Sequence, residues 1–246
     1  MVMEQEKSEW WRRNVRGSVG DRINLVHILD VMKEAPNLPA LWKTLAHDKE
    51  VAVRLEVAKS LSAPPETLAE MAWCEDNVGV QSALADNRNL PVEAMQHFLG
   101  LCDRTVVVSL LYNESTPDWI LRKIAEMDYT DFYMMGKLAQ HPNISADTLD
   151  FLYGRASQLV SDAPARVAMV VLNIAKNPSA GVELLWKLLD FGVQKDFAFI
   201  RAALLLNPSL PEEILMFLLM DSDDEVREHA EQKVKVQKET ENERDS

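Results

Sequence analysis

The sequence predicts an all-α protein, an α-solenoid of about seven two-helix repeats of 25–36 residues. Three observations lead to this prediction. A short motif, usually ending in proline, recurs along most of the 246-residue chain. Glycine is scarce, with eight residues, whereas leucine, alanine and glutamate, which favour helices, are plentiful. Apolar residues behind each motif recur at the spacing of a helix.

The recurring motif is clearest in Asn207-Pro208-Ser209-Leu210-Pro211, and its last residue is the anchor of the repeat. Corresponding anchors lie at positions 39, 64, 91, 117, 145, 181 and 211, so the spacings are 25, 27, 26, 28, 36 and 30 residues. Seven anchors in register are the signature of a repeat protein. The two long spacings predict insertions near residues 155–165 and 191–196.

Each anchor predicts the start of a helix, because proline is favoured in a first helical turn. Five repeats carry an acid two residues later, where negative charge complements the helix dipole: Glu66, Glu93, Asp147, Glu183 and Glu213. A second, shorter helix is expected after each first one, as in residues 51–59 and 78–86. Two helices per repeat, each leaning on its neighbours, give a one-dimensional fold.

The two ends lack the motif. Residues 1–34 are predicted to form a helical N-terminal cap, in which Trp10 and Trp11 cover the open end of the first repeat. Residues 35–234 hold the repeats. Residues 235–246 are charged and almost without apolar side chains, which predicts a charged tail that is disordered or a frayed helix.

The repeat signature Pro-x-x-x-Leu-x-x-Leu-Ala-x-Asp-x-x-x-x-Val-Arg-x-x-x-Ala-x-Asn-Pro resembles the leucine-rich repeat variant family, a relative of HEAT-like repeats. The resemblance runs from about residue 35 to residue 234 and implies a right-handed superhelix. Its valine–arginine element is present at Val53-Arg54 and Val226-Arg227, and loosely at Ile200-Arg201. Elsewhere Gln81, Val107, Met135 and Val171 replace the arginine. One family member has an N-terminal cysteine cluster for an iron–sulfur centre, which this chain lacks, so no cofactor is implied.

Charge and cysteine content restrict the partners. The net charge is −13 and no basic stripe is readable, which argues against nucleic acid and against an anionic membrane surface. A basic or neutral protein partner is favoured instead. Two cysteines make no disulfide framework, and no signal peptide or apolar run of about 18 residues occurs. We therefore expect a soluble cytoplasmic protein.

Two polar columns recur with the repeat. An amide-rich column comprises Asn87, Asn113, Asn177 and Asn207, with Ser60 and His141 in the same place. It could contact a ligand, but satisfying backbone groups in the turn between helices is the favoured interpretation. An acidic column comprises Asp48, Glu75, Asp103, Asp128, Asp190 and Asp221. It could attract lysine-rich partners or a divalent ion, but helix capping is favoured.

Catalytic and metal-binding patterns are missing from the sequence. The five histidines have no ligand spacing, and no nucleophile elbow or phosphate loop occurs. Cys74 and Cys102 occupy equivalent positions in adjacent repeats, and we expect them to be small core residues rather than metal ligands. The chain is therefore predicted not to be an enzyme, with no cofactor and no metal.

Exposed positions that depart from the repeat are the candidate binding residues. Trp119 lies where five other repeats have an acid, so it is either an exposed anchor for a partner or packed on a neighbouring repeat. The variable column of the second helices is expected to face solvent and to bind the partner; its candidate members are Lys59, Asp86, Tyr112, Gln140 and Lys176. Trp42, Trp73 and Trp186 are expected in the core.

The function predicted from the sequence is a non-enzymatic scaffold that presents a repeat surface to a protein or peptide. One alternative is a nucleic-acid-acting enzyme on a HEAT-like scaffold, such as a DNA glycosylase, which would need a basic groove with an aromatic–acid pocket. The other alternative is a structural or self-assembling subunit. A map of surface charge and exposed aromatic residues distinguishes the enzyme from the two other classes.

Overall fold

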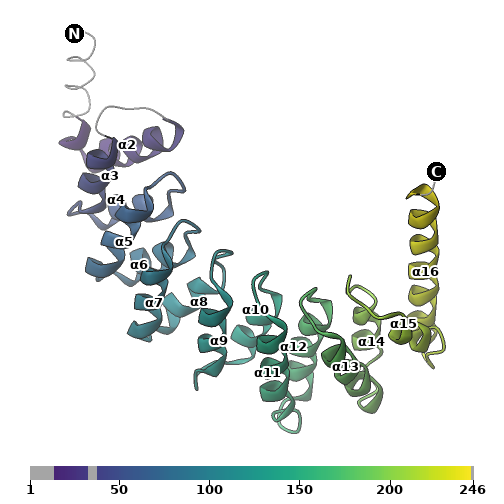
Figure 1. Ribbon diagram of the computed structural model, residues 1–246. Helices are drawn as coiled ribbons and strands as arrows, with labels where there is room; N and C mark the ends of the chain where they lie inside the picture. Colours follow the sequence, from purple (N-terminus) through teal and green to yellow (C-terminus); the bar gives the residue numbers. More distant parts are fainter. Residues whose placement is uncertain (1–13, 33–37, 245–246) are drawn as a thin grey trace. The chain divides into compact units, whose positions relative to one another are not determined.

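The computed structural model of the chain describes residues 14–32 and 38–244, and within them helices are the only regular secondary structure (Figure 1). The all-α prediction is therefore confirmed for these residues. Trp10 and Trp11, together with residues 35–37 of the first motif, lie outside the described residues. The chain divides into two compact units, Met1–Ile120 and Leu121–Ser246. The division falls within helix α9 (Asp118–Glu126).

Unit 1 consists of helices that alternate between two rows. Its helices are α2 (Val19–Val31), α3 (Leu38–Ala46), α4 (Val51–Lys59), α5 (Pro65–Cys74), α6 (Val78–Asp86), α7 (Val92–Leu101) and α8 (Arg104–Leu110). The even-numbered helices pack in sequence on one another and form what we call the even row. Helices α3, α5 and α7 pack in the same way as a second row.

Unit 2 repeats the alternation. Its helices are α10 (Phe132–Gln140), α11 (Ala146–Ser157), α12 (Pro164–Lys176), α13 (Val182–Gln194), α14 (Ala198–Leu204), α15 (Glu212–Leu218) and α16 (Asp224–Arg244). Helices α10, α12, α14 and α16 pack in sequence and form the even row of this unit. Each of α11, α13 and α15 packs against the even-numbered helix that follows it.

Six of the seven anchors lie one residue before their helices, and Pro39 lies in the first turn of α3, as predicted. Pro64, Pro91 and Pro211 each occupy the N-cap position with extended backbone, at φ between −60° and −62°. Ser145 and Gly181 occupy the same position before α11 and α13. The sequence placed proline inside the first turn, but the N-cap suits it equally, because no helical hydrogen bond requires an N–H group there. The second helices at 51–59 and 78–86 begin and end as predicted.

The core lies between the two rows in each unit and is apolar. Trp42 is fully buried, as predicted, and so are Phe98 of α7 and Leu152 of α11. These side chains lie on the inner face of their helices, at the spacing that made the helices recognisable. None of the helices described is both long and apolar enough to cross a lipid bilayer.

Helix α16 extends through most of the predicted tail. The sequence predicted disorder or a frayed helix from residue 235, and α16 continues without a break from Asp224 to Arg244. Val226 and Ala230 are buried and fix the first turns of α16. Lysine, glutamate and glutamine dominate the remainder and have high intrinsic helix propensity, so the helix can continue without a core to cover.

Asp103 provides a test of the capping interpretation of the acidic column. Its carboxylate accepts hydrogen bonds from the backbone N–H groups of Thr105 (2.8 Å) and Val106 (3.2 Å). We expect Asp103→Ala to lower the free energy of unfolding by about 1 kcal/mol, because these N–H groups lose their acceptor. Asp103→Ser should keep most of that energy, and urea unfolding measures both. Equal losses in the two variants would mean that the negative charge matters and the cap does not.

Candidate functional site

The amide column forms a ladder that links successive repeats. The side-chain amide of Asn87 donates to the carbonyl oxygens of Ala58 and Ser60, both at 2.8 Å, and both belong to the preceding repeat. Its oxygen accepts the backbone N–H of Asn89 at 2.9 Å. Asn113 in turn donates to the carbonyl oxygen of Asn87 at 2.8 Å. The favoured structural interpretation is confirmed, and the column also joins one repeat to the next.

The ladder continues in unit 2 with the same geometry. Asn207 donates to the carbonyl oxygens of Ala175 and Asn177, both at 2.8 Å. After the last repeat, the ammonium group of Lys233 on α16 takes the place of an asparagine and donates to the carbonyl oxygen of Leu205 at 2.6 Å. Burial lowers the pKa of Lys233. Since the asparagines of the ladder are buried and bonded to backbone, they are not available to bind a ligand.

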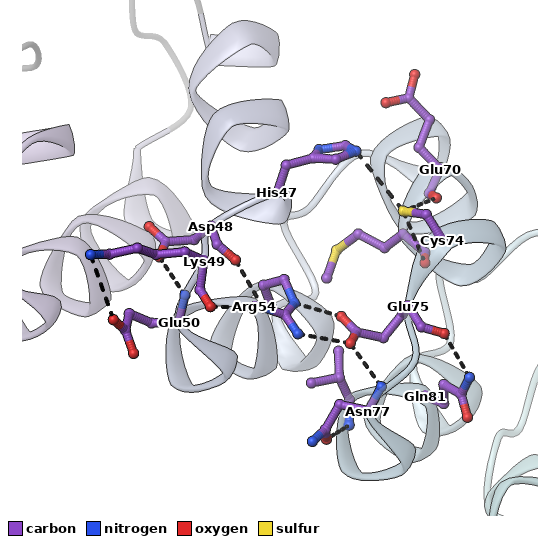
Figure 2. A network of polar contacts seen from close by, with 12 residues as sticks. His47, Asp48, Lys49, Glu50, Arg54, Glu70, Cys74, Glu75, Asn77 and Gln81 are labelled. Carbon is purple, nitrogen blue, oxygen red and sulfur yellow. Dashed lines mark hydrogen bonds and ion pairs between the residues drawn. The ribbon is translucent and has the colours of Figure 1, made fainter.

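A second series of contacts pairs arginines of the even row with acids of the next repeat (Figure 2). Arg54 donates from Nε and Nη2 to the two carboxylate oxygens of Glu75, at 2.7 and 2.9 Å. Its Nη1 donates back to the carbonyl oxygen of Asp48 at 2.9 Å. The carboxylate of Asp48 is itself paired with Arg22, at 3.1 Å. Arg54 therefore connects the turn before its own helix to the turn of the following repeat.

Arg201 in unit 2 has the same three contacts. Its Nε and Nη2 donate to the carboxylate of Asp221 at 2.8 and 2.9 Å, and its Nη1 donates to the carbonyl oxygen of Gly192 at 3.0 Å. A Cβ atom added to Gly192 would lie 2.8 Å from Cγ of Arg201, so a residue without a side chain is needed there. The arginine of the valine–arginine element thus has a defined structural role at both positions.

These pairs change the interpretation of the acidic column. Glu75 and Asp221 are buried and bonded to arginine, and only Asp103 among the column members caps its helix through bonds to the first turn. Asp128 and Asp190 are exposed. Burial raises the pKa of the Glu75 carboxyl, but the hydrogen bond and the charge of Arg54, together with hydrogen bonds from the backbone of Asn77 and Asp76, lower the net pKa. The column is therefore neither a uniform set of caps nor a continuous acidic edge.

Exposed residues of unit 1 gather on either side of the amide ladder. Lys59, Asp86 and Tyr112 immediately precede the ladder positions Ser60, Asn87 and Asn113, and all three are exposed. They line one groove of about 730 Å³, which we call the unit 1 groove. The residues that follow the ladder positions line the same groove: Leu61, Arg88 and Glu114. Sequence reasoning missed these last three because turn residues lie outside the helical pattern, although they recur with the repeat.

The unit 1 groove has balanced charge. Lys59 and Arg88 supply two cations, and Asp86 and Glu114 supply two carboxylates. Burial raises the pKa of the Asp86 carboxyl, since part of this side chain is withdrawn from water. Tyr112 provides an aromatic surface that is 48% exposed. Such a surface can bind polar and aromatic groups of a partner but has no excess of either charge.

The remaining predicted residues of the variable column lie in unit 2. Gln140 and Lys176 are both exposed, as expected for this column. Lys176 lines a second groove of about 940 Å³, which we call the unit 2 groove. This groove runs over α14 between α12 and α16, and its apolar lining includes Leu172, Phe199, Ala202 and Leu206. Lys176 and Leu206 belong to the variable column read from the sequence, but the groove itself could not be predicted, because three helices must lie side by side to form it.

The tryptophans depart from the prediction in two places. Trp119 is exposed, which agrees with the first of its two predicted roles, but it does not line the unit 1 groove with Tyr112. Trp73 and Trp186 were expected in the core and are exposed, Trp73 by 60%. Trp73 lies on the outer side of α5, where its ring is 4.1 Å from that of His97 on α7.

Cys74 and Cys102 are also exposed, so the prediction that they are core residues was wrong. Both lie where a helix of the second row of unit 1 ends. Cys74 is the last residue of α5, and Cys102 follows α7 in a left-handed conformation with φ of 55°. Positions at the end of a helix therefore do not follow the inner face of its middle turns, and Cys74 donates to the carbonyl oxygen of Glu70 at 3.1 Å instead of packing in the core.

The described residues contain no cluster of three or more His, Cys, Asp and Glu side chains that could hold a metal ion. The perturbed carboxyls of Glu75 and Asp221 are engaged with arginine. What the geometry offers is two grooves on the even-row helices, one of mixed charge and one largely apolar. Comparisons with protein-family models, with curated proteins and with solved structures found no match.

Proposed function

We propose that this chain is an α-solenoid, a right-handed superhelix of leucine-rich repeat variant type, that binds a protein or peptide along its even row and catalyses no reaction. The unit 1 groove supports the proposal most strongly. Three successive repeats each contribute the side chain before the ladder position and the side chain after it, so exposed residues are displayed at repeat spacing. Repeat proteins bind partners through extended surfaces of this kind.

The buried ladders strengthen this argument. Hydrogen bonds from side-chain amides and arginine–acid ion pairs link one repeat to the next, as Asn87 and Arg54 do in unit 1. The groove residues are therefore positioned before a partner arrives, which reduces the entropy lost on binding. Sparse cysteines favour a cytoplasmic partner protein.

Charge makes nucleic acid a poorer partner. Phosphate binding needs an excess of lysine and arginine, because counterion release supplies most of the affinity. The unit 1 groove matches two cations with two carboxylates, and the whole chain has a net charge of −13. A protein partner with mixed charge and at least one group that packs on an aromatic ring fits better.

Tyr112→Ala tests the proposal. The full-length chain is used to capture proteins from the native cell, and the recovered partners are quantified by mass spectrometry. We expect Tyr112→Ala to reduce the recovery of specific partners by about tenfold, because truncation of an aromatic anchor commonly costs more than 1 kcal/mol.

Tyr133→Ala is the matched control. Tyr133 lies on α10 and is 50% exposed, against 48% for Tyr112, but it lines neither groove. It should leave recovery unchanged. Recovery that falls equally in both variants, or in neither, would contradict binding at the unit 1 groove. Trp119→Ala, run in parallel, asks whether that exposed tryptophan is a second anchor.

A further inference from the structure

We propose that the unit 2 groove binds an amphipathic helical segment of a partner protein, with large apolar side chains flanked by lysine or arginine. This inference rests on the proposed function, since it specifies the partner class of a protein-binding chain. The groove has an apolar floor, an acidic rim and two helices as its walls. Each of these features restricts which partner can bind.

The floor is formed by α14 and the turn that follows it. Phe199 and Leu206 are both exposed, and they line the groove together with Ala202. A volume of about 940 Å³ accommodates several apolar side chains. Large apolar side chains gathered in one concavity are typical of a docking site, whereas single exposed ones are ordinary on any surface.

The rim carries more negative than positive charge. Asp196, Asp223 and Glu225 line the groove on the side of α16 and of the turn before α14. Of the two lysines, Lys176 is exposed, while the ammonium group of Lys233 is engaged with the carbonyl oxygen of Leu205. Cationic side chains beside the apolar ones of a partner would meet this rim favourably.

The same charge argues against a second copy of the chain as the occupant. At a net charge of −13, a second copy would bring further negative charge to an already acidic rim. A basic segment of a different protein would not meet this electrostatic repulsion.

The walls favour a helical partner. The groove lies between helices α12 and α16, so it offers no open strand edge to which a peptide could add a strand. Recognition must therefore rely on side chains. An amphipathic helix presents a row of apolar side chains to such a groove while its own backbone is fully hydrogen-bonded.

A phage-displayed library of random peptides, selected on the immobilised full-length chain, tests the inference. We expect enriched peptides with apolar residues at helical spacing and lysine or arginine beside them. The double variant Phe199→Ala, Leu206→Ala should weaken their binding by about tenfold or more. The control Phe217→Ala, Met216→Ala on α15 should leave it unchanged, because Phe217 is 45% exposed, against 46% for Phe199, and lies outside the groove.

The acidic rim is tested with Asp196→Asn, Glu225→Gln, which should weaken binding and reduce its dependence on salt. Asparagine is chosen because Asp196 has a φ of 55°, which asparagine tolerates. Glu212→Gln, Glu213→Gln, in the first turn of α15 and outside the groove, removes the same number of charges and is the matched control.

The outcomes separate this inference from the proposed function. Peptides whose binding is lost in Tyr112→Ala but kept in Phe199→Ala, Leu206→Ala would support the proposed function and overturn the unit 2 site. If no peptide is enriched, the inference about the unit 2 groove fails, whereas the proposed function is still decided by the recovery of partners with Tyr112→Ala and Tyr133→Ala. Self-association of the chain in sedimentation experiments, abolished by Phe199→Ala, Leu206→Ala, would assign the groove to a second copy and overturn the inference.

Discussion

Arg201→Ala is expected to lower the free energy of unfolding by about 3–5 kcal/mol, because it leaves the carboxylate of Asp221 buried without its partner. Both side chains of this pair are 3% exposed. The substitution also removes the hydrogen bond to the carbonyl oxygen of Gly192. Urea unfolding at neutral pH, followed by circular dichroism, measures the loss.

Two further variants show what the loss depends on. Arg201→Lys keeps the positive charge but cannot donate to both carboxylate oxygens and to Gly192 with the same geometry, so it should also destabilise. Arg122→Ala removes an arginine from an exposed pair with Glu126 and from its contact with the ring of Phe151, and it should cost much less than Arg201→Ala. A similar small loss for Arg201→Ala would contradict a structural role for the buried pair.

The pH dependence of the same pair has a definite sign. Burial raises the pKa of the Asp221 carboxyl, but hydrogen bonds from Arg201 and from the backbone of Asp223 outweigh it, so the net pKa is lowered. A carboxyl with a lowered folded-state pKa stabilises the fold above its unfolded-state pKa. That contribution is lost as the pH falls through the folded-state value. The difference between the native chain and Arg201→Ala should therefore shrink on acidification.

The helices could be predicted from the sequence because their signals are local. Proline anchors and apolar spacing lie within one helix, so no knowledge of its neighbours is needed to find it. It is harder to predict whether a side chain near a helix end points to the core or to solvent, since an error of one residue in the helical register rotates the side chain by about 100°. Trp73 and Cys74, at the end of α5, were assigned to the core for this reason and are exposed.

The arginine–acid pairs could not be derived from one repeat. Arg54 and Glu75 lie in different repeats, and the sequence alone does not show which arginine faces which acid. A signal was nevertheless present. The acids that are buried and bonded to arginine follow a repeat that carries the arginine, as Asp221 follows Arg201, whereas Asp190 follows a repeat with Val171 and is exposed.

Part of the candidate site was predictable for the same local reasons. Lys59, Asp86 and Tyr112 were assigned to an exposed column, and they line one groove. The unit 2 groove requires α12, α14 and α16 to lie side by side, and the sequence of a single helix does not show its neighbours. Its apolar residues Phe199 and Leu206 become a site only when α16 lies beside them.

Asn87→Ala should be the second large effect, a loss of about 3 kcal/mol in the free energy of unfolding. Asn87 is 4% exposed, and its amide donates to the carbonyl oxygens of Ala58 and Ser60. Each buried polar group left without a partner costs about 1–3 kcal/mol. Asn89→Ala is the control, because that side chain makes a single bond at the surface, to the carbonyl oxygen of Leu61. Urea unfolding of both variants measures the difference.

Asn87→Asp separates the two roles that this residue could have. Aspartate can still accept the backbone N–H of Asn89, so it would be tolerated if asparagine served only its own turn. It cannot donate, however, and its charge would face two carbonyl oxygens of the preceding repeat. We therefore expect Asn87→Asp to be at least as destabilising as Asn87→Ala at neutral pH, and to recover partly in acid, where a protonated carboxyl can donate one bond. A mild effect at neutral pH would mean that the asparagines stabilise only their own turns. Asparagine and aspartate can both accept the bond within the turn, and only asparagine can donate the bonds to the preceding repeat.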